Sequence, residues 1–282
     1  MIELHPADYH KSVKPLQSVT INTLFAESVI RQHIRGMVYV DSVVSPMTFY
    51  IKHPYGMSLL FGKTENREFN ESLYHYLINS KERRQSEELL QVYPEDWYER
   101  LENLLGKSLL KMSKGQAFQK KTATGRNHQV QQYERINFSF KYGSYYQNKK
   151  QSTGIRYPIE VIDKEIFEQF TGQVAPINFW NSAEDFLAQA KGYCLMVDQK
   201  VASVAFASFI IGNKIEIGVE TKPEYRGEGF ATIVCSALID DCLEKDCLPV
   251  WSCHAGNIDS IRLANRLGFK AGRTIPYYRL VC

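Results

Sequence analysis

One short stretch of the chain, Arg226 to Ala231, combines residue types and a spacing that suit phosphate binding: Arg226-x-x-Gly229-x-Ala231. Gly227 and Gly229 lack Cβ atoms, so a ligand can approach the backbone closely and positive φ angles cost little. A helix that begins near Gly229 would direct its unpaired N–H groups and the positive end of its dipole at the loop. A pyrophosphate fits such a turn, although surface turns use the same residues and the loop alone is a weak signal.

The flanks of this loop strengthen the interpretation. Before it, apolar and polar residues alternate from Lys214 to Thr221, which predicts a strand with Glu216, Gly218 and Glu220 on one face. After it, apolar residues recur at helical spacing and predict a helix with one buried face: Ala231, Val234, Cys235, Leu238 and Cys242. Strand, glycine-rich turn and helix in this order are more specific than the glycines alone.

A second strand and a capped helix follow. The segment Leu248 to Cys253 reads as a strand, and Asn257 is placed to cap a helix with Asp259 in its first turn. That helix is predicted to end at Gly268, with Phe269 as the hydrophobic residue that follows a glycine C-terminal cap.

With these blocks in place, the chain resembles the GNAT superfamily of acetyl-CoA-dependent N-acetyltransferases. Arg226, Gly229 and Ala231 match its pyrophosphate-loop signature, and Asn257-x-x-Ser260 with Leu267-Gly268-Phe269 resembles its second block. The resemblance covers the last half of the chain. The segments Glu220–Pro223, Trp251–Cys253 and Leu263–Asn265 are similar to a bacterial two-domain group that includes the zwittermicin A resistance acetyltransferase, which does not fix the substrate.

The resemblance implies roles for particular residues. The backbone of Val219 and Thr221 would pair with pantetheine like an added strand, and the N–H at or next to Val219 would hold the oxyanion. Asn257 would reach the pantetheine arm or the acetyl group, and Ser260 belongs to the same block. The pyrophosphate would be bound by the loop residues Arg226, Gly227, Glu228, Gly229, Phe230 and Ala231.

Acetyl transfer to an amine also needs a base, and a proton for the leaving thiolate. Glu216 is the first candidate for the base because many family members carry a Glu at this point; an exposed strand carboxylate without a catalytic role is the alternative, and Glu220 is next in line. The usual acid of the family is a Tyr at the position of Ala264, so the acid is left unassigned, with Tyr277, Tyr278 and Ser260 as candidates. Cys253 beside His254 leaves a covalent, ping-pong route open.

The fold class expected is α+β. Residues 146–282 are predicted to form a GNAT domain with a mixed, mostly antiparallel, splayed sheet flanked by helices. The order is a strand from Ile155 to Ile162, helices capped by Asp163 and by Ser182 or Asn181, a three-strand meander from Tyr193 to Thr221, and the elements described above.

Residues 1–145 are predicted to form a separate α+β domain of uncertain role. Its strands are expected at Met37–Val40, Met47–His53 and Met57–Phe61, and its helices near Asn70–Asn79 and Trp97–Leu105. Gly36–Asp41 echoes Gly192–Asp198, which suggests a degenerate copy of the same fold, although hairpins with Val-Asp before a turn are common. The boundary is expected within the polar segment 142–154.

Composition agrees with a cytoplasmic enzyme. The 282 residues suffice for two domains, hydrophobic residues make up 44% and charged residues 23%, and no stretch could span a membrane. The net charge of +3 is too small to imply nucleic acid. Lys107–Arg135 is rich in basic residues and could contact RNA or a phosphorylated substrate, but a solvated loop is favoured. The six cysteines read as reduced thiols, and no metal-ligand spacing is seen.

The sequence therefore predicts an acetyl-CoA-dependent N-acetyltransferase. It is expected to acetylate a primary amine of a small molecule by direct attack in a ternary complex. Acetyl-CoA is the expected cosubstrate, without a metal, membrane or nucleic acid partner. The alternative is an acetyl-CoA-binding sensor or pseudoenzyme that acts through a protein partner. The acceptor and the oligomeric state are not fixed by the sequence.

Overall fold

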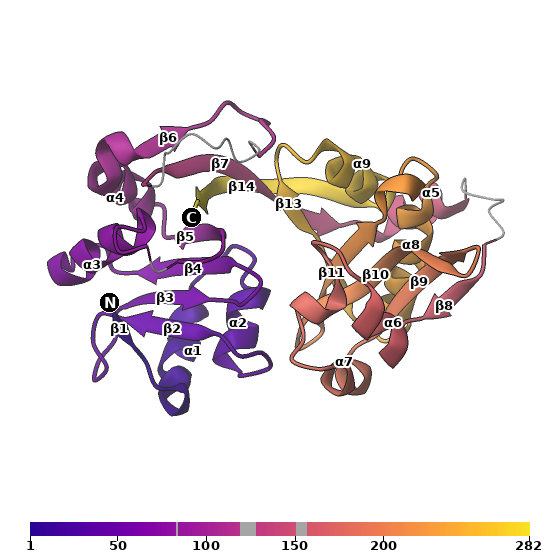
Figure 1. The fold of residues 1–282 in the computed structure, drawn as a ribbon, viewed down its shortest axis with the longest axis horizontal. Coiled ribbons are helices and arrows are strands. Elements are labelled where there is room, and N and C mark those ends of the chain that lie inside the picture. Colours follow the sequence, from indigo (N-terminus) through magenta and orange to yellow (C-terminus); the bar gives the residue numbers. More distant parts are fainter. Residues whose placement is uncertain (83, 119–127, 151–156) are drawn as a thin grey trace. The chain divides into compact units, whose positions relative to one another are not determined.

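The computed structural model describes residues 1–82, 84–118, 128–150 and 157–282, and its chain divides into two compact units (Figure 1). Unit 1 comprises Met1–Ile136, Cys253–Ile258 and Arg273–Cys282, and unit 2 comprises Asn137–Ser252 and Asp259–Gly272. The chain therefore passes between the units more than once. The linear division at residue 145 stays a prediction.

Unit 1 holds the N-terminal strands and the C-terminal end of the chain. Its sheet follows the order β1-β2-β3-β4-β5-β14-β7-β13, with β6 paired to β7. Its strands are β1 (Ile2–Glu3), β2 (Met37–Val40), β3 (Thr48–Lys52), β4 (Met57–Gly62), β5 (Glu88–Tyr93) and β6 (Leu109–Lys111), together with β7 (Val130–Phe140), β13 (Ser252–His254) and β14 (Phe269–Leu280), which continue into unit 2. Its helices are α1 (Val13–Leu16), α2 (Leu24–Ile30), α3 (Arg67–Leu77) and α4 (Asp96–Leu105), with 3₁₀ turns η1 (Pro6–Ser12) and η2 (Gly106–Ser108).

Unit 2 holds the predicted acetyltransferase elements in the predicted order. Its strands are β8 (Ile159–Val161), β9 (Gly192–Val197), β10 (Lys200–Ile211), β11 (Lys214–Thr221) and β12 (Leu248–Val250), in the sheet order β12-β11-β10-β9-β8. Its helices are α5 (Tyr142–Lys150), α6 (Lys164–Gln169), α7 (Ala183–Gln189), α8 (Phe230–Glu244) and α9 (Ile258–Arg266), with 3₁₀ turns η3 (Pro176–Asn178) and η4 (Pro223–Tyr225).

The two halves repeat one topology. In unit 1, β1 to β4 pair antiparallel in sequence and β5 then joins β4 in parallel after helix α3. In unit 2, β8 to β11 pair antiparallel in sequence and β12 joins β11 in parallel after helix α8. Two helices follow the first strand in each case. The echo between Gly36–Asp41 and Gly192–Asp198 therefore falls on equivalent strands, β2 and β9, as a degenerate second copy of the fold requires.

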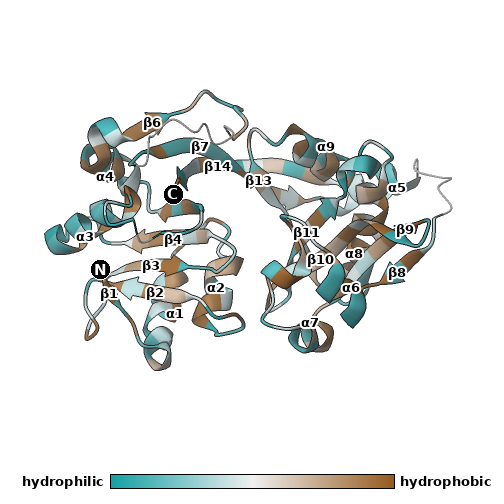
Figure 2. Cartoon of the chain, in the orientation of Figure 1, coloured by the Kyte–Doolittle hydropathy of each residue, from teal (hydrophilic) through white to brown (hydrophobic). Residues whose placement is uncertain are grey.

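The core of unit 2 lies between α8 and the central strands. Ile215 and Ile217 of β11 pack with Val234, Cys235 and Leu238 of α8 in one buried cluster. Figure 2 shows hydrophobic residues along β10 and α8 and hydrophilic ones on α6. All six cysteines are free thiols, as the sequence predicts. Within the described ranges, no helix is long and apolar enough to cross a membrane.

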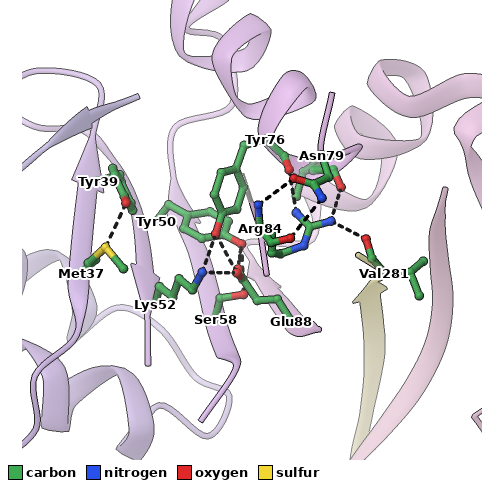
Figure 3. A network of polar contacts seen from close by, with 11 residues as sticks. Met37, Tyr39, Tyr50, Lys52, Ser58, Tyr76, Asn79, Arg84, Glu88 and Val281 are labelled. Carbon is green, nitrogen blue, oxygen red and sulfur yellow. Dashed lines mark hydrogen bonds and ion pairs between the residues drawn. The ribbon is translucent and has the colours of Figure 1, made fainter. Parts of the chain in front are cut away.

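Unit 1 contains a buried polar network that ties strands β3 and β5 to helix α3 (Figure 3). Glu88 is fully buried, and its carboxylate accepts hydrogen bonds from the hydroxyls of Tyr50 and, at 2.7 Å, Tyr76. Lys52 Nζ lies 3.1 Å from the same carboxylate. A buried carboxylate is tolerated when a cation and several donors surround it, so this network has the character of a structural clamp.

Several helix termini in unit 2 lie where the sequence predicts them. Asp163 caps α6 by accepting from Ile166 N–H at 2.8 Å, and Ser182 caps α7 by accepting from Asp185 N–H at 3.1 Å. Gly268 follows α9 with φ of 85°, and a Cβ there would lie 2.6 Å from Tyr145 N. Only glycine combines this conformation with so close a neighbour.

Several predicted boundaries need correction. Of the two candidate caps of the second helix, Ser182 and not Asn181 is its N-cap, and the helix begins at Ala183. The strand expected over Leu248–Cys253 is interrupted at Trp251, which separates β12 from β13. The final strand, β14, begins at Phe269, directly after Gly268. The first predicted strand is described only from 159 to 161, since Ile155 and Arg156 lie outside the described residues.

The polar segment 142–154, within which the domain boundary is expected, contains helix α5 in its described part. Tyr145 is buried, and its hydroxyl donates to Asp240 Oδ1 at 2.8 Å on helix α8. Lys149 Nζ lies 2.5 Å from the other oxygen of the same carboxylate. Tertiary anchoring of this kind supports a helix that has no apolar periodicity of its own.

Candidate active site

Strand β11 leads directly into the glycine-rich loop. The strand ends at Thr221, the turn η4 follows, and α8 begins at Phe230. Gly227 has φ of 90° and Gly229 φ of 82°, so both adopt the left-handed conformation that glycine accepts without strain. Gly229 is the N-cap residue of α8 and, having no side chain, cannot itself supply an oxygen to the first N–H groups of the helix. This is the geometry of an anion site at a helix N-terminus.

The side chains of the loop divide into an exposed and a buried set. The side chain of Arg226 is 62% exposed; its Nε donates to Thr221 O at 3.2 Å. Glu228 is exposed and Ala231 is partly buried. Phe230 is buried and its ring lies 4.9 Å from that of Tyr157, edge to face. Phe230 therefore anchors the loop, while Arg226 is available to an anion in solution.

Strand β11 continues past its pairing with β12. The parallel register joins Lys214 to Leu248 and Glu216 to Val250, whereas β11 itself runs on to Thr221. On its other side the strand stays paired with β10, where Val219 lies opposite Ala205. The side of β11 beyond residue 216 is thus where an extended ligand such as pantetheine could add to the strand. Thr221 is fixed by a hydrogen bond of 2.8 Å between its hydroxyl and that of Ser203.

Glu216 is not the exposed strand carboxylate that the sequence left as an alternative. It is 4% exposed, and its Oε1 accepts a hydrogen bond of 2.7 Å from the hydroxyl of Ser252. Ser208 Oγ donates to the backbone oxygen of Glu216 at 2.9 Å, which fixes the strand beside it. A carboxylate with a fixed orientation on this strand is a candidate general base.

Ser252 was missed by the sequence analysis. The signal that could have found it is the parallel register: Glu216 lies opposite Val250, and Ser252 follows two residues later along the chain. A hydroxyl two positions beyond the strand partner of a candidate base is a reason to look for a hydrogen bond. The register itself, however, is a property of the fold.

Glu220 lies two positions beyond Gly218 on the same face of β11 as Glu216. Its Oε2 accepts from Val174 N–H at 2.9 Å, and its Oε1 lies 3.6 Å from Arg226 Nη2. Both carboxylate oxygens are therefore directed at neighbouring segments of unit 2, and this residue is less suited than Glu216 to proton transfer.

The second sequence block has a mainly structural environment. Ser260 Oγ accepts a hydrogen bond of 3.2 Å from Trp251 Nε1, which joins α9 to the segment between β12 and β13. Ala264 is fully buried in the core cluster of unit 2. Asn257 is exposed and belongs to unit 1, where its N–H donates to His254 O at 2.9 Å.

Tyr277 and Tyr278 belong to unit 1 and point to opposite faces of β14, as strand alternation predicts. Tyr278 is buried in the main hydrophobic cluster of unit 1, and burial raises its pKa. Tyr277 lies outside that cluster; its hydroxyl is 3.4 Å from Arg135 Nη1, and the Arg135 guanidinium carbon is 5.1 Å from its ring centroid.

His254, the partner of Cys253 in the ping-pong alternative, lies in an aromatic cluster of unit 1. Its ring stacks on Phe118 at 4.1 Å and meets Tyr133 edge to face at 5.0 Å. Burial, and then the charges of Arg135 and Arg279, lower the pKa of His254 to about 4. The imidazole is therefore neutral at neutral pH.

The basic stretch Lys107–Arg135 is only partly described, because Lys120, Lys121 and Arg126 lie outside the described residues. Lys111 Nζ pairs with Glu102 at 2.7 Å on the surface. Arg135 is buried, so the expectation of a solvated loop is wrong for this residue. In the part of the chain that the structure describes, no group of three or more His, Cys, Asp or Glu side chains could hold a metal ion.

Unit 2 thus brings together a phosphate-type loop, the strand β11, which extends beyond its pairing with β12, and the buried carboxylate of Glu216 on that strand. These features are those expected of an acyltransferase. Comparison with known proteins agrees: residues 14–278 match the family model described as GNAT acetyltransferase. The chain belongs to this family and is an acyltransferase enzyme.

Individual relatives cover nearly the whole chain. The protein named uncharacterized N-acetyltransferase YdfB of Bacillus subtilis is 27% identical over 254 residues, which are 87% of this chain and 86% of the relative. A GCN5-related N-acetyltransferase-like protein from Streptococcus suis superposes with a TM-score of 0.69 at 19% identity, covering 97% of this chain and 99% of the other.

A third comparison concerns the repeated topology. A tandem GNAT protein from the clavulanic acid biosynthesis pathway has a TM-score of 0.59 at 10% identity, and covers 99% of this chain and 97% of its own. At these identities the solved structures show the fold alone. The two-domain layout is consistent with that of a tandem GNAT protein.

Proposed function

We propose that this acyltransferase transfers an acetyl group from acetyl-CoA to a primary amine of a small molecule, by direct attack in a ternary complex. The observation that carries the proposal is the buried Glu216, which is held by Ser252 and lies on the strand that leads into the phosphate-type loop. Base and cosubstrate site are thus parts of one continuous element.

Binding comes first in the proposed mechanism. The loop Arg226–Ala231 would hold the pyrophosphate through backbone N–H groups and the exposed Arg226 side chain. Pantetheine would lie along β11 beyond its register with β12, paired with the backbone of Val219 and Thr221. The thioester would then be directed towards Glu216.

Chemistry follows at the same strand. Glu216 removes a proton from the ammonium group of the acceptor, directly or through a water molecule, and the free amine attacks the thioester carbon. The backbone N–H at or next to Val219 stabilises the oxyanion of the tetrahedral intermediate. Collapse breaks the C–S bond, and the new amide nitrogen releases its remaining extra proton to water. The coenzyme A thiolate takes a proton from Tyr277 or Tyr278, or from water.

The acceptor class is inferred from the finer resemblance. The segments Glu220–Pro223 and Trp251–Cys253 are similar to the group that includes the zwittermicin A resistance acetyltransferase, so amine-bearing antibiotics are the first acceptors to test. We place the enzyme in the cytoplasm, where free thiols persist and acetyl-CoA is available.

The test is a screen of primary amines for coenzyme A release, followed by Glu216→Gln on the acceptor found. Gln keeps the shape of the side chain and removes its basicity, so turnover should fall by roughly 10²–10⁴-fold with acetyl-CoA affinity nearly intact. The matched control is Glu244→Gln, at the exposed end of α8. Turnover within a few-fold of the parent at every pH would remove Glu216 from the mechanism.

One observation favours a second candidate, an acetyl-CoA-binding sensor. Ala264 fills the position of the family's usual acid with a methyl group that is fully buried in the core. A protein that binds acetyl-CoA with normal affinity, but releases no coenzyme A with any amine tested, would support this candidate.

A further inference from the structure

The carboxylate of Glu220 connects two segments of unit 2 that are far apart in the sequence. Its Oε2 accepts a hydrogen bond from Val174 N–H at 2.9 Å, in the connection between α6 and α7. Its Oε1 lies 3.6 Å from Nη2 of Arg226, in the phosphate-type loop. The side chain is 16% exposed, so both interactions are partly shielded from water.

A second residue fixes the same connection to the end of β11. Lys222 Nζ donates to Thr171 O at 2.6 Å and lies 4.6 Å from the ring centroid of Phe170. A Cβ at Gly172 would lie 3.1 Å from Glu220 Cγ, so the backbone approaches the carboxylate more closely than a larger residue would allow. The residues 170–174, which we call the α6–α7 strap, therefore lie against Glu220 and Lys222.

The strap lies on the catalytic face of β11. Ile215 and Ile217 point into the core with α8, so Glu216, Gly218 and Glu220 point to the opposite face. The same α6–α7 connection also reaches the neighbourhood of Glu216. Phe179 lies 5.5 Å from the ring of Phe209, and Phe209 is the β10 residue opposite Glu216. The α6–α7 connection therefore lies against the face of β10 and β11 that carries Glu216.

We propose that Glu220 is a positioning residue that couples the phosphate-type loop to the α6–α7 strap, so that cosubstrate binding orders the acceptor side of the site. This inference rests on the proposed binding of acetyl-CoA at Arg226–Ala231. A pyrophosphate carries more negative charge than one carboxylate and draws the exposed Arg226 away from Glu220. Relieved of that cation, Glu220 holds Val174 N–H more strongly, because a hydrogen bond to an uncompensated charge is the stronger one.

Thermodynamic linkage makes this coupling reciprocal. If the bound cosubstrate raises the affinity for the acceptor by ordering the strap, the bound acceptor must raise the affinity for the cosubstrate by the same factor. The coupling depends on three charged side chains of β11 and the residues that follow it. Arg226 contacts the bound anion, Glu220 contacts Val174 N–H, and Lys222 holds the strap in both states.

The test measures amide hydrogen exchange of peptides that cover residues 170–178, with and without coenzyme A as the probe. In the parent protein, coenzyme A should slow exchange in these peptides by about tenfold, within the usual range of coupling between sites. In Glu220→Gln, which keeps an acceptor for Val174 N–H but loses the charge, the slowing should fall below about twofold. Calorimetry on the same samples reports coenzyme A affinity.

A second variant acts in the opposite direction. Arg226→Gln removes the competing cation, so the strap should exchange slowly even before coenzyme A is added. The matched control is Glu224→Gln, an exposed carboxylate in η4, which should behave as the parent does. Circular dichroism confirms that each variant is folded.

The outcomes separate the coupling from the proposed function. Coenzyme A that binds the parent without slowing strap exchange, or slows it equally in Glu220→Gln, overturns the coupling alone. A parent that does not bind coenzyme A overturns the proposed cosubstrate and the coupling with it.

Discussion

The hydroxyl of Ser252 donates a 2.7 Å hydrogen bond to Oε1 of Glu216, joining β13 to the middle of β11. Glu216 is almost completely buried, and a buried polar group needs hydrogen-bond partners to offset the loss of water. Ser252 is therefore a positioning residue for the proposed base, because it fixes the orientation of the carboxylate.

Replacement of Ser252 by Ala should show how much the proposed base depends on this contact. Without the donor, the carboxylate loses the hydrogen bond that fixes its orientation, so turnover should fall by about tenfold. Ser252→Thr, which keeps a hydroxyl on a strand, is the control. Normal turnover in Ser252→Ala would show that this hydrogen bond has no catalytic role.

Gly229→Trp tests the cosubstrate loop. Gly229 has φ of 82° at the start of α8, and a large side chain there would occupy the space in front of the helix N-terminus. The Kd for acetyl-CoA should rise on the order of 100-fold by calorimetry. Gly212→Trp is the matched control, because Gly212 also has positive φ, at 58°, and a Cβ there meets nothing within 4 Å. Equal affinities in the two variants would contradict the assignment.

His53 should make stability depend on pH. It is fully buried in unit 1, its Nδ1 accepts from Tyr55 N–H at 3.0 Å, and burial lowers its pKa from 6.5 to about 3. The folded state thus keeps His53 neutral while the unfolded state protonates below pH 6.5. The stabilisation is complete above that pH and is lost as the pH falls towards the folded value.

His53→Asn keeps an acceptor for Tyr55 N–H but cannot titrate. When the pH falls from neutral to about pH 5, the free energy of unfolding of the parent, measured in urea, should decrease by about 2 kcal/mol more than that of the variant. His5→Asn, an exposed histidine, provides the comparison. Parallel pH dependences in parent and His53→Asn would mean that His53 is accessible to protons in the folded protein.

Local signals allowed most of unit 2 to be predicted from the sequence. The caps Asp163 and Ser182, the glycines at 227, 229 and 268, and the alternation in β11 each act within a few residues of their position. Such interactions involve residues that are close together in the sequence, so they can be predicted from it, and the structure confirms these predictions.

Features that depend on distant residues could not be predicted. Helix α5 is held by the contact of Tyr145 with Asp240, and the partner of Glu216 follows from the parallel register of β11 with β12. The two-unit division interleaves segments that are far apart in the sequence. The repeat of strand order between β1–β5 and β8–β12 is visible in pairing, whereas the sequence shows only the echo at Gly36–Asp41.

The N-terminal copy also shows why one cosubstrate loop is expected. Helix α3, the equivalent of α8, is capped by Asn66, whose side chain accepts from Phe69 N–H at 2.9 Å. At Gly62 a Cβ would lie 2.1 Å from Met47 O, so this glycine serves strand packing. An N-terminus that is already capped by its own side chain is a poorer anion site than the one at Gly229.

The final prediction concerns the proton for the leaving thiolate. Ala264 occupies the usual position of the acid, and Tyr277 and Tyr278 point to opposite faces of β14, so at most one of them can serve. Tyr278 is enclosed in the core of unit 1 and its pKa is raised by burial, which makes it a poor proton donor. Tyr277 is also buried, but it lies outside that hydrophobic cluster with its hydroxyl 3.4 Å from Arg135 Nη1, and it is the better candidate. Tyr277→Phe should therefore lower turnover by about tenfold, while Tyr278→Phe stays within about twofold of the parent.

Steady-state turnover of the two variants, with thermal unfolding as a check on folding, decides between the donors. Tyr278→Phe is the matched control, since it removes the same hydroxyl from the neighbouring residue of the same strand. A loss confined to Tyr278→Phe would reverse the assignment. Two enzymes with normal turnover would show that water protonates the thiolate, which is chemically reasonable because a coenzyme A thiolate is a tolerable leaving group near neutral pH. In that case alanine at position 264 does not lower turnover. The proton transfer that the reaction requires of the protein is then the removal of a proton from the amine by Glu216, which Ser252 orients.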